Sequence, residues 1–411
     1  MINIMFLMCG AKPPRGDFFL IDLITNLRKD MFNPLVIYVE NSSLIEAVKK
    51  RGIATIHIPI GGRVTSLFPS ELLFNPFKLL KFIFHFVASG YFIKLGRILR
   101  NHHIDVMYAR DGISKTSGGI VAKLLKIKVI GHCHNDFSGK QFRGIKNYIV
   151  GKALKAIDLI FLDRIIAVAE NVRSCFKGNK GFKKTIVIYN GVDTSFFNPE
   201  KTPDGLNLNE FCIGEKPTII GCIGSLERLK GQSVLFKAIE GLISEGNNKT
   251  NIFCLVCGDG PEKEHYMKEV EERGLRKKVL FMGFQNDVRR VLKTLDVLVV
   301  PSYQESCCMS AIEAMSMRVP VVGSKVGGLV EIIKDGETGI LVPPGDYNSL
   351  SQALTYLIGN PQVRKRLGVN GRKRVLEKFT SEQNTRKTEE IILNILKKRP
   401  SGWSTEDKNP Q

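Results

Sequence analysis

The strongest constraint on the fold is a regular alternation of short apolar runs with amphipathic helical stretches. In the first half of the chain, seven runs have the length of buried strands: residues 2–8, 35–39, 54–60, 105–108, 128–131, 165–169 and 185–188. Helical patterns such as residues 18–27 and 116–125 lie between them. Strand-length runs that alternate with segments of period 3.6 predict βαβ units around a parallel sheet.

The alternation begins again after a polar stretch at residues 190–217. Six further runs follow, at residues 218–223, 251–257, 279–282, 297–300, 320–322 and 340–342. We therefore predict an α/β fold with two doubly wound parallel-sheet domains, residues 1–190 and 218–380, joined by a linker over residues 191–217. A length of 411 residues also favours two domains over one core.

The end of the chain carries one more helical pattern, which we assign to residues 381–398 and expect to pack back on the first domain. Residues 399–411 are rich in Pro, Ser and charge, and we expect a flexible tail there. Doubly wound sheets bind ligands in crevices beyond the carboxyl ends of their strands. The chemistry is therefore expected between the two domains.

The charge of the chain is unevenly distributed. Residues 1–190 contain 29 Lys and Arg against 12 Asp and Glu, whereas the whole chain has a net charge of +20. A basic half attracts nucleic acid, an anionic membrane surface or a phosphorylated substrate. A nucleic-acid-binding protein would also need exposed aromatics among the basic residues or a known reading motif, and neither is evident.

Cysteine usage and hydropathy favour a reduced, cytosolic chain. The nine cysteines lie mostly in apolar runs, and the N-terminus has no signal-peptide pattern. Cys254 and Cys257 form a lone CxxC without the second ligand pair of a zinc site, so we interpret them as core thiols.

Residues 72–93 are too polar to span a bilayer, and they fit either a helix packed on a sheet or an interfacial amphipathic helix.

The stretch ESCCMSAIEAM, residues 305–315, places two carboxylates eight positions apart, directly after the run 297–300. Ser306 suits the N-cap of a helix over residues 307–317, whose first amides could hold a phosphate. Glu305 and Glu313 would lie about 10 Å apart along that helix. They could grip the two ends of a diphosphate that links two hydroxyl-rich rings. Alternatively, Glu313 is a solvated helix residue and Glu305 a loop charge.

Several longer motifs support the first interpretation. They are GSLERLKG (224–231), CGDGPEKEHY (257–266), VLFMGFQNDV (279–288), LDVLVVPSYQES (295–306), VPVVGSKVGGLVEII (319–333) and DGETGILVPPGD (335–346). Together with the 305/313 pair, they resemble the retaining glycosyltransferases of family 4. The resemblance implies the GT-B fold, in which two Rossmann-like domains face each other across a cleft.

The resemblance also implies roles for single residues. Glu313 would hold the ribose of a nucleotide-sugar, and Glu305 would face the transferred sugar. Lys230 would neutralise the diphosphate, with no metal ion and no cofactor other than a UDP-sugar or GDP-sugar as donor substrate. The expected donor-binding set is Gly16, Ser225, Arg228, Lys230, Ser306, Cys308, Met309, Ser310 and Glu313, and the expected catalytic set is Glu305, Lys230 and His134.

Some positions depart from the family pattern. Ser225 stands where the family commonly has arginine, so we expect Arg228 to supply a second cation. The pair Cys307-Cys308 follows Ser306 where the family usually has a glycine, and it fits either packed thiols or a redox pair.

In the first domain, Gly16 is the candidate for close approach of the donor, and Lys12 and Arg15 are candidates for an anionic acceptor. His134 in GHCHND is expected to orient the donor sugar, with His132 on the opposite face of the strand. A packed, purely structural histidine is the alternative for His134.

The expected activity is transfer of a sugar, with retention of configuration, to a lipid-linked anionic glycan during surface polysaccharide or lipopolysaccharide synthesis. The enzyme would be cytoplasmic and would associate through its basic domain with the inner face of the plasma membrane. Two other hypotheses remain open: a catalytically weak GT-B-like binding subunit and, with less support, a nucleic-acid-binding protein.

Overall fold

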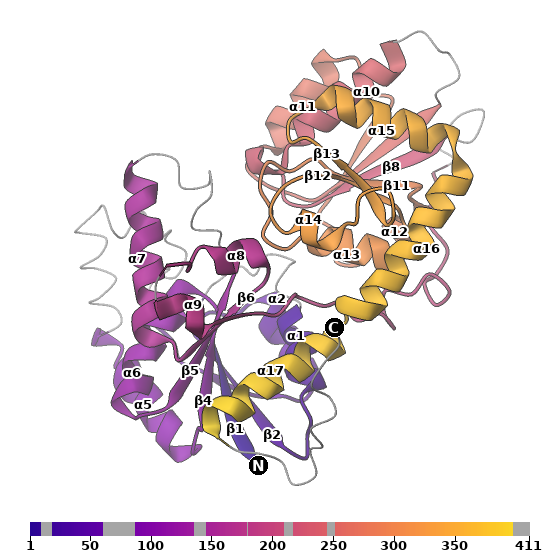
Figure 1. The fold of residues 1–411 in the computed structure, drawn as a ribbon. Coiled ribbons are helices and arrows are strands. Elements are labelled where there is room, and N and C mark those ends of the chain that lie inside the picture. The colour runs from indigo at the N-terminus through magenta and orange to yellow at the C-terminus, as the bar shows by residue number, and fades with distance from the viewer. Residues whose placement is uncertain are drawn as a thin grey trace. The chain divides into compact units, whose positions relative to one another are not determined.

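The computed structural model describes residues 1–9, 19–60, 87–134, 145–178, 180–208, 217–244 and 251–397. These residues form two α/β units, each built around its own parallel sheet (Figure 1). Unit 1 comprises Met1–Val168, Val172–Ile188 and the C-terminal part from Glu382. Unit 2 comprises Ala169–Asn171 and Tyr189–Ser381. Parts of two sequence-based assignments, 72–86 and 399–411, lie outside the described residues.

Unit 1 contains a seven-stranded parallel sheet in the order β3-β2-β1-β4-β5-β6-β7. Its strands are β1 (Ile2–Met8), β2 (Phe32–Tyr38), β3 (Ala54–His57), β4 (Val106–Ala109), β5 (Lys128–Cys133), β6 (Arg164–Ala167) and β7 (Thr185–Val187). Its helices are α1 (Phe19–Asn26), α2 (Ser43–Lys50), α5 (Tyr91–Asn101), the π-helix η2 (Ser114–Gly118), α6 (Gly119–Leu124), α7 (Ile145–Phe161), α9 (Lys180–Lys184) and nearly all of α17 (Ser381–Leu396). The short helix α8 (Glu170–Ser174) begins in unit 2 and ends in unit 1.

Unit 2 contains a six-stranded parallel sheet in the order β10-β9-β8-β11-β12-β13. Its strands are β8 (Thr218–Ile223), β9 (Ile252–Cys257), β10 (Val279–Gly283), β11 (Val297–Val300), β12 (Val321–Ser324) and β13 (Gly339–Val342). Its helices are the 3₁₀ turn η4 (Arg228–Lys230), α10 (Gln232–Ser244), α11 (Lys263–Glu272), α12 (Arg289–Thr294), α13 (Met309–Ser316), α14 (Leu329–Ile332), α15 (Tyr347–Gly359) and α16 (Pro361–Lys378).

Both sheets are covered by helices on their two faces, which explains why most strands are continuous apolar runs rather than alternating ones. In unit 2, one core lies against α12, α13, α14 and α16, and the other against α10, α11 and α15. All six residues of β9 are buried, because their side chains enter both cores in turn. The predicted fold class is confirmed, and each of the thirteen predicted runs overlaps a strand.

The C-terminal helix α17 packs into the core of unit 1. Ile392 is fully buried in the cluster that also contains side chains of α1 and α2. The buried carboxylate of Glu389 accepts two hydrogen bonds from Arg28, one from its backbone N–H and one from Nε, each 2.8 Å long. The helix is therefore fixed to unit 1 by apolar packing and by a bidentate polar contact.

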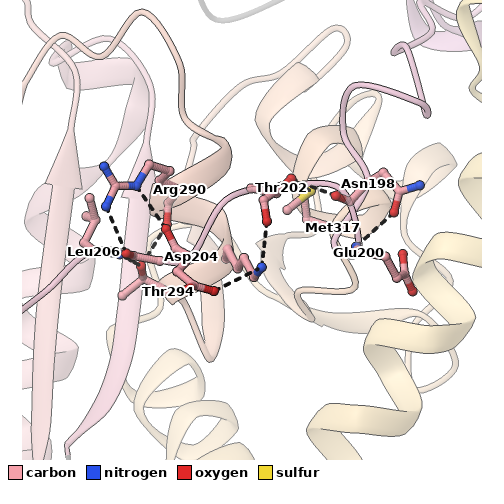
Figure 2. A network of polar contacts seen from close by, with 10 residues as sticks. Asn198, Glu200, Thr202, Asp204, Leu206, Arg290, Thr294 and Met317 are labelled. Atoms are coloured by element: carbon pink, nitrogen blue, oxygen red, sulfur yellow. Dashed lines mark hydrogen bonds and ion pairs between the residues drawn. The ribbon is translucent and has the colours of Figure 1, made fainter.

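The described part of the segment assigned as a linker is bonded to unit 2. Figure 2 shows its residues 198–206 along α12 and the end of α13. Arg290 Nε donates to the carbonyl of Asp204 over 3.0 Å. The backbone N–H of Leu206 donates to Thr294 Oγ1 over 2.7 Å. These contacts hold the segment at fixed points of α12.

Gly258 follows β9 in a conformation reserved for glycine, with φ of +146°. A Cβ atom there would lie 1.8 Å from the carbonyl oxygen of Gly224, which follows β8. We expect Gly258→Ala to lower the free energy of unfolding by about 3 kcal/mol, because strain and overlap with backbone add. Gly359→Ala is the matched control, since no atom lies within 4 Å of that Cβ position. Urea denaturation of both variants checks this, and equal stabilities would contradict it.

Candidate active site

The candidate site of unit 2 lies where the strand order of the sheet changes direction. β8 and β11 are neighbours there, with Val297 paired to Ile220. Their carboxyl ends therefore meet at one edge of the sheet, although about 75 residues separate them in sequence. The loop after β8 leads into η4 with Lys230, and the loop after β11 carries Glu305. The topology alone brings these two side chains together.

Lys230 and Glu305 form an ion pair, with 2.7 Å between Nζ and Oε1. Glu305 is only 7% exposed. Ser302 Oγ donates a second hydrogen bond, 2.9 Å long, to the same Oε1 atom. Within the described residues, both bonds to this carboxylate go to Oε1 and none to Oε2. The carboxylate is therefore fixed on one side and remains free to accept hydrogen bonds on the other.

The Glu305 carboxylate stabilises the charged form of Lys230. Burial disfavours the ammonium form of Lys230, but the adjacent Glu305 carboxylate outweighs it and raises the pKa of Lys230. The lysine is consequently a cation at neutral pH. A cation in this position offsets the cost of burying the carboxylate, which would otherwise be large.

The backbone around Glu305 is held by two neighbouring loops. The N–H of Tyr303 donates to the carbonyl of Leu229 over 2.8 Å, which ties the loop after β11 to η4. The N–H of Gly328 donates to the carbonyl of Glu305 over 3.0 Å. Gly327 has a φ of +43°, and a Cβ there would lie 1.8 Å from that same carbonyl oxygen. These contacts fix the main chain of Glu305, while Lys230 and Ser302 fix its side chain.

The helix that follows begins later than predicted. Its N-cap is Cys308 rather than Ser306, and α13 runs from Met309 to Ser316. The reason is that Ser306 belongs to the loop whose carbonyls pack on Gly328, where a Cβ would lie 2.0 Å from the Ser306 oxygen. Ser310 lies in the first turn of α13, where backbone N–H groups have no partner within the helix. Glu313 is on α13 and is 8% exposed, so it is not a solvated helix residue.

The predicted phosphate loop has a different arrangement of cations from the expected one. Arg228 pairs with Glu262 over 3.1 Å, and its side chain is 84% exposed. The carbonyl of Ser225 accepts a hydrogen bond of 2.9 Å from Nε2 of Gln232, whose side chain is buried. Of the two predicted cations, only Lys230 contacts the candidate acid.

His134 of unit 1 follows β5, close to His132. The prediction that these two histidines lie on opposite faces is wrong: their ring centroids are 4.3 Å apart. Residues two apart in an extended chain point to the same side, which explains the contact. His132 Nδ1 and the hydroxyl of Tyr108 share a hydrogen bond of 2.9 Å. Burial lowers the pKa of both histidines well below the ordinary value, so both rings are neutral at pH 7.

Two further predictions concern the loop after β1 and the cysteine pair before α13. Gly16, Lys12 and Arg15 lie outside the described residues. Burial raises the pKa values of Cys307 and Cys308 to about 12, so both thiols stay protonated and are packed rather than reactive.

The described residues contain no group of three or more His, Cys, Asp or Glu side chains placed to hold a metal ion. Of the helices in the described part of the chain, none is both long and apolar enough to cross a bilayer.

Ser302, Gly327 and Gly328 are parts of the site that were not predicted from the sequence. Ser302 lies three residues before Glu305 in a turn, which is the one local signal that could have indicated it. The contacts of the two glycines join loops that follow different strands, so no local pattern reports them.

Comparison with known proteins identifies the family of the chain. Residues 207–374 match the family model described as "Glycosyl transferases group 1". Residues 20–196 match that described as "Glycosyltransferase Family 4". The two matches together cover most of the chain, one in each of the predicted domains.

Individual proteins are similar as well. N-acetyl-alpha-D-glucosaminyl L-malate synthase of Bacillus anthracis is 24% identical over 75% of this chain and 80% of its own length. The capsular polysaccharide biosynthesis glycosyltransferase CapM of Staphylococcus aureus is 29% identical over 44% of this chain and 47% of its own. The solved structure of Anabaena Alr3699/HepE in complex with UDP-glucose aligns with a TM-score of 0.77 at 19% identity, covering 96% of this chain and 100% of that one. The chain thus belongs to the family 4 glycosyltransferases and has their GT-B fold.

Proposed function

We propose that this glycosyltransferase is a metal-independent, retaining enzyme that transfers a sugar from a nucleotide-diphosphate-sugar to a glycan hydroxyl. The observation that carries the proposal is the ion pair between Lys230 and the buried Glu305 at the switch point of the second sheet. A cation beside the N-terminus of α13 offers a site for a diphosphate, and the fixed carboxylate beside it suits sugar hydroxyls.

The chemistry follows from where charge develops. Cleavage of the glycosyl–phosphate bond builds positive charge on the sugar and negative charge on the departing diphosphate. Lys230 and the first amides of α13 would stabilise that negative charge. Oε2 of Glu305 would accept a hydrogen bond from the transferred sugar, and Glu313 would bind the ribose hydroxyls.

His134 is proposed to orient the donor sugar. Its Nε2 atom is buried and has no hydrogen-bond partner among the described residues. The ring is neutral, so it can donate or accept one hydrogen bond without bringing a charge near the oxocarbenium centre. Retention would result from attack of the acceptor hydroxyl on the face that the diphosphate leaves, with the diphosphate as local base.

The acceptor is proposed to be a lipid-linked, anionic glycan. The basic excess of residues 1–190 supports it, because such a domain is attracted to anionic lipid surfaces. The relative CapM acts, by its name, in capsular polysaccharide biosynthesis. The enzyme would then work at the cytoplasmic face of the membrane in surface polysaccharide or lipopolysaccharide synthesis.

Loss of either charge of the pair is expected to abolish most activity. We expect Lys230→Ala and Glu305→Gln each to lower kcat at least about 100-fold, because each removes stabilisation specific to the transition state. Lys268→Ala is the control, since Lys268 is 77% exposed in a surface pair with Glu272. Release of nucleoside diphosphate from the donor is the measurement. Full activity in both site variants would refute the assignment.

Ser302 should act by positioning Glu305. We expect Ser302→Ala to lower kcat about 10- to 100-fold, since a hydrogen bond to a charged group contributes about 1.5–3 kcal/mol. The KM for the donor should change less than kcat, because Lys230 still binds the diphosphate. Steady-state kinetics separate the two constants. A rise in KM with unchanged kcat would instead show that Ser302 serves only donor binding.

Donor identity should appear as thermal stabilisation. A ligand that binds only the folded state raises Tm by mass action, so one class among UDP-sugars and GDP-sugars is expected to raise Tm most. Lys230→Ala should reduce that shift strongly. Differential scanning fluorimetry with a panel of nucleotide-sugars tests this. The absence of a shift with every member would contradict a nucleotide-sugar site.

A further inference from the structure

A groove of about 570 Å³ lies in unit 1 between α5 and α6. Its lining includes Phe92, Ile93, Gly96, Arg97, Arg100 and Leu124. Figure 1 shows these two helices side by side. Gly96 lines the groove where α5 approaches α6, and a Cβ at that position would be in van der Waals contact with Val121 of α6 at 3.6 Å.

Helix α5 has two faces of opposite character. Tyr91, Leu95 and Leu99 recur every four residues and are at most 1% exposed, so this face belongs to the core. Ile93, Arg97 and Arg100 recur on the other side and are exposed. Core packing therefore explains only one face of the helix.

The apolar residues around the groove are unusually exposed. Ile93 is 71% exposed, and Leu124 of α6 is 79% exposed. Ile120, one turn before Leu124, is 38% exposed. Exposed aliphatic side chains gathered at a groove usually mark a surface of interaction.

Two arginines, Arg97 and Arg100, lie beside these residues. Among the described residues, neither Arg97 nor Arg100 forms an ion pair, whereas Lys123 of α6 is bonded to Asp163 over 3.3 Å. The arginines lie one turn apart, at the side of the groove. An anion with an apolar body would complement this surface in both charge and polarity.

We propose that this α5–α6 face, defined by Ile93, Arg97, Arg100, Ile120 and Leu124, binds the surface of an anionic phospholipid bilayer. The two guanidinium groups would bind lipid phosphates, and the aliphatic side chains would enter the interface between headgroups and acyl chains. This inference rests on the proposed function, because a lipid-linked acceptor requires an enzyme that works at a membrane.

Other occupants fit the face less well. Single-stranded nucleic acid is bound through aromatic side chains on which bases stack, whereas the most exposed apolar residues here are aliphatic. The centre of a protein interface is depleted in charge, whereas this groove contains two arginines that form no ion pair within the described part of the chain.

The test is sedimentation of the full chain with vesicles of phosphatidylglycerol and phosphatidylcholine, and with vesicles of phosphatidylcholine alone. We expect Arg97→Ser/Arg100→Ser to weaken binding to the anionic vesicles about 30-fold, since each cation near such a surface contributes about fivefold. Ile93→Ser/Leu124→Ser should also weaken it. Arg386→Ser/Lys387→Ser is the matched control, because it removes two exposed cations of α17 in the same unit and should bind nearly as the parent does.

Three outcomes would overturn the proposal: equal binding to neutral vesicles, parental binding by the Arg97/Arg100 variant, or no binding by the parent chain. Binding of a short single-stranded DNA that the same variant abolishes would assign the face to nucleic acid instead. Hydrolysis of the donor is measured on the same protein preparations before vesicles are added. Failure of hydrolysis contradicts the proposed function, whereas normal hydrolysis with unchanged vesicle binding contradicts only the role of this face.

Discussion

The contact between Lys230 and Glu305 is the interaction on which the candidate site depends. A carboxylate that is 7% exposed is stable only if a cation and hydrogen-bond donors replace its water. Here one ammonium and one hydroxyl do so at a single oxygen atom. The arrangement is possible because a doubly wound sheet brings the ends of β8 and β11 side by side. Fold and site are therefore consequences of one strand order.

Much of this fold could be predicted from single segments. Strands buried on both faces are apolar throughout, so most of them can be recognised in the sequence as short apolar runs. The boundaries were less certain where polar or constrained residues lie inside a strand. β2 begins at Phe32, three residues before the predicted run, because Asn33-Pro34 interrupts the apolar pattern although the backbone still pairs with β1. The N-cap of α13 was misplaced because Ser306 has a good capping side chain but is held in the preceding loop.

The site could be predicted only where its residues carry a local pattern. The spacing of Glu305 and Glu313 indicated two acids with distinct roles, and both proved buried. No spacing indicated that Gly327 and Gly328 support the main chain of Glu305, because that contact joins loops after different strands. The error about His132 had another cause. It was a mistake about strand geometry, since residues two apart share a face.

The charge compensation within the pair also determines how it would respond to a diphosphate. Lys230 neutralises Glu305, so the buried carboxylate is not an isolated anion. A diphosphate would bring further negative charge, and we infer that the lysine would then be shared between the carboxylate and the phosphate. Ser302 would keep Glu305 in place during this exchange, because its hydrogen bond to Oε1 does not depend on the lysine. A carboxylate held by Ser302 and an ammonium at the end of a long, partly exposed side chain are suited to these two tasks.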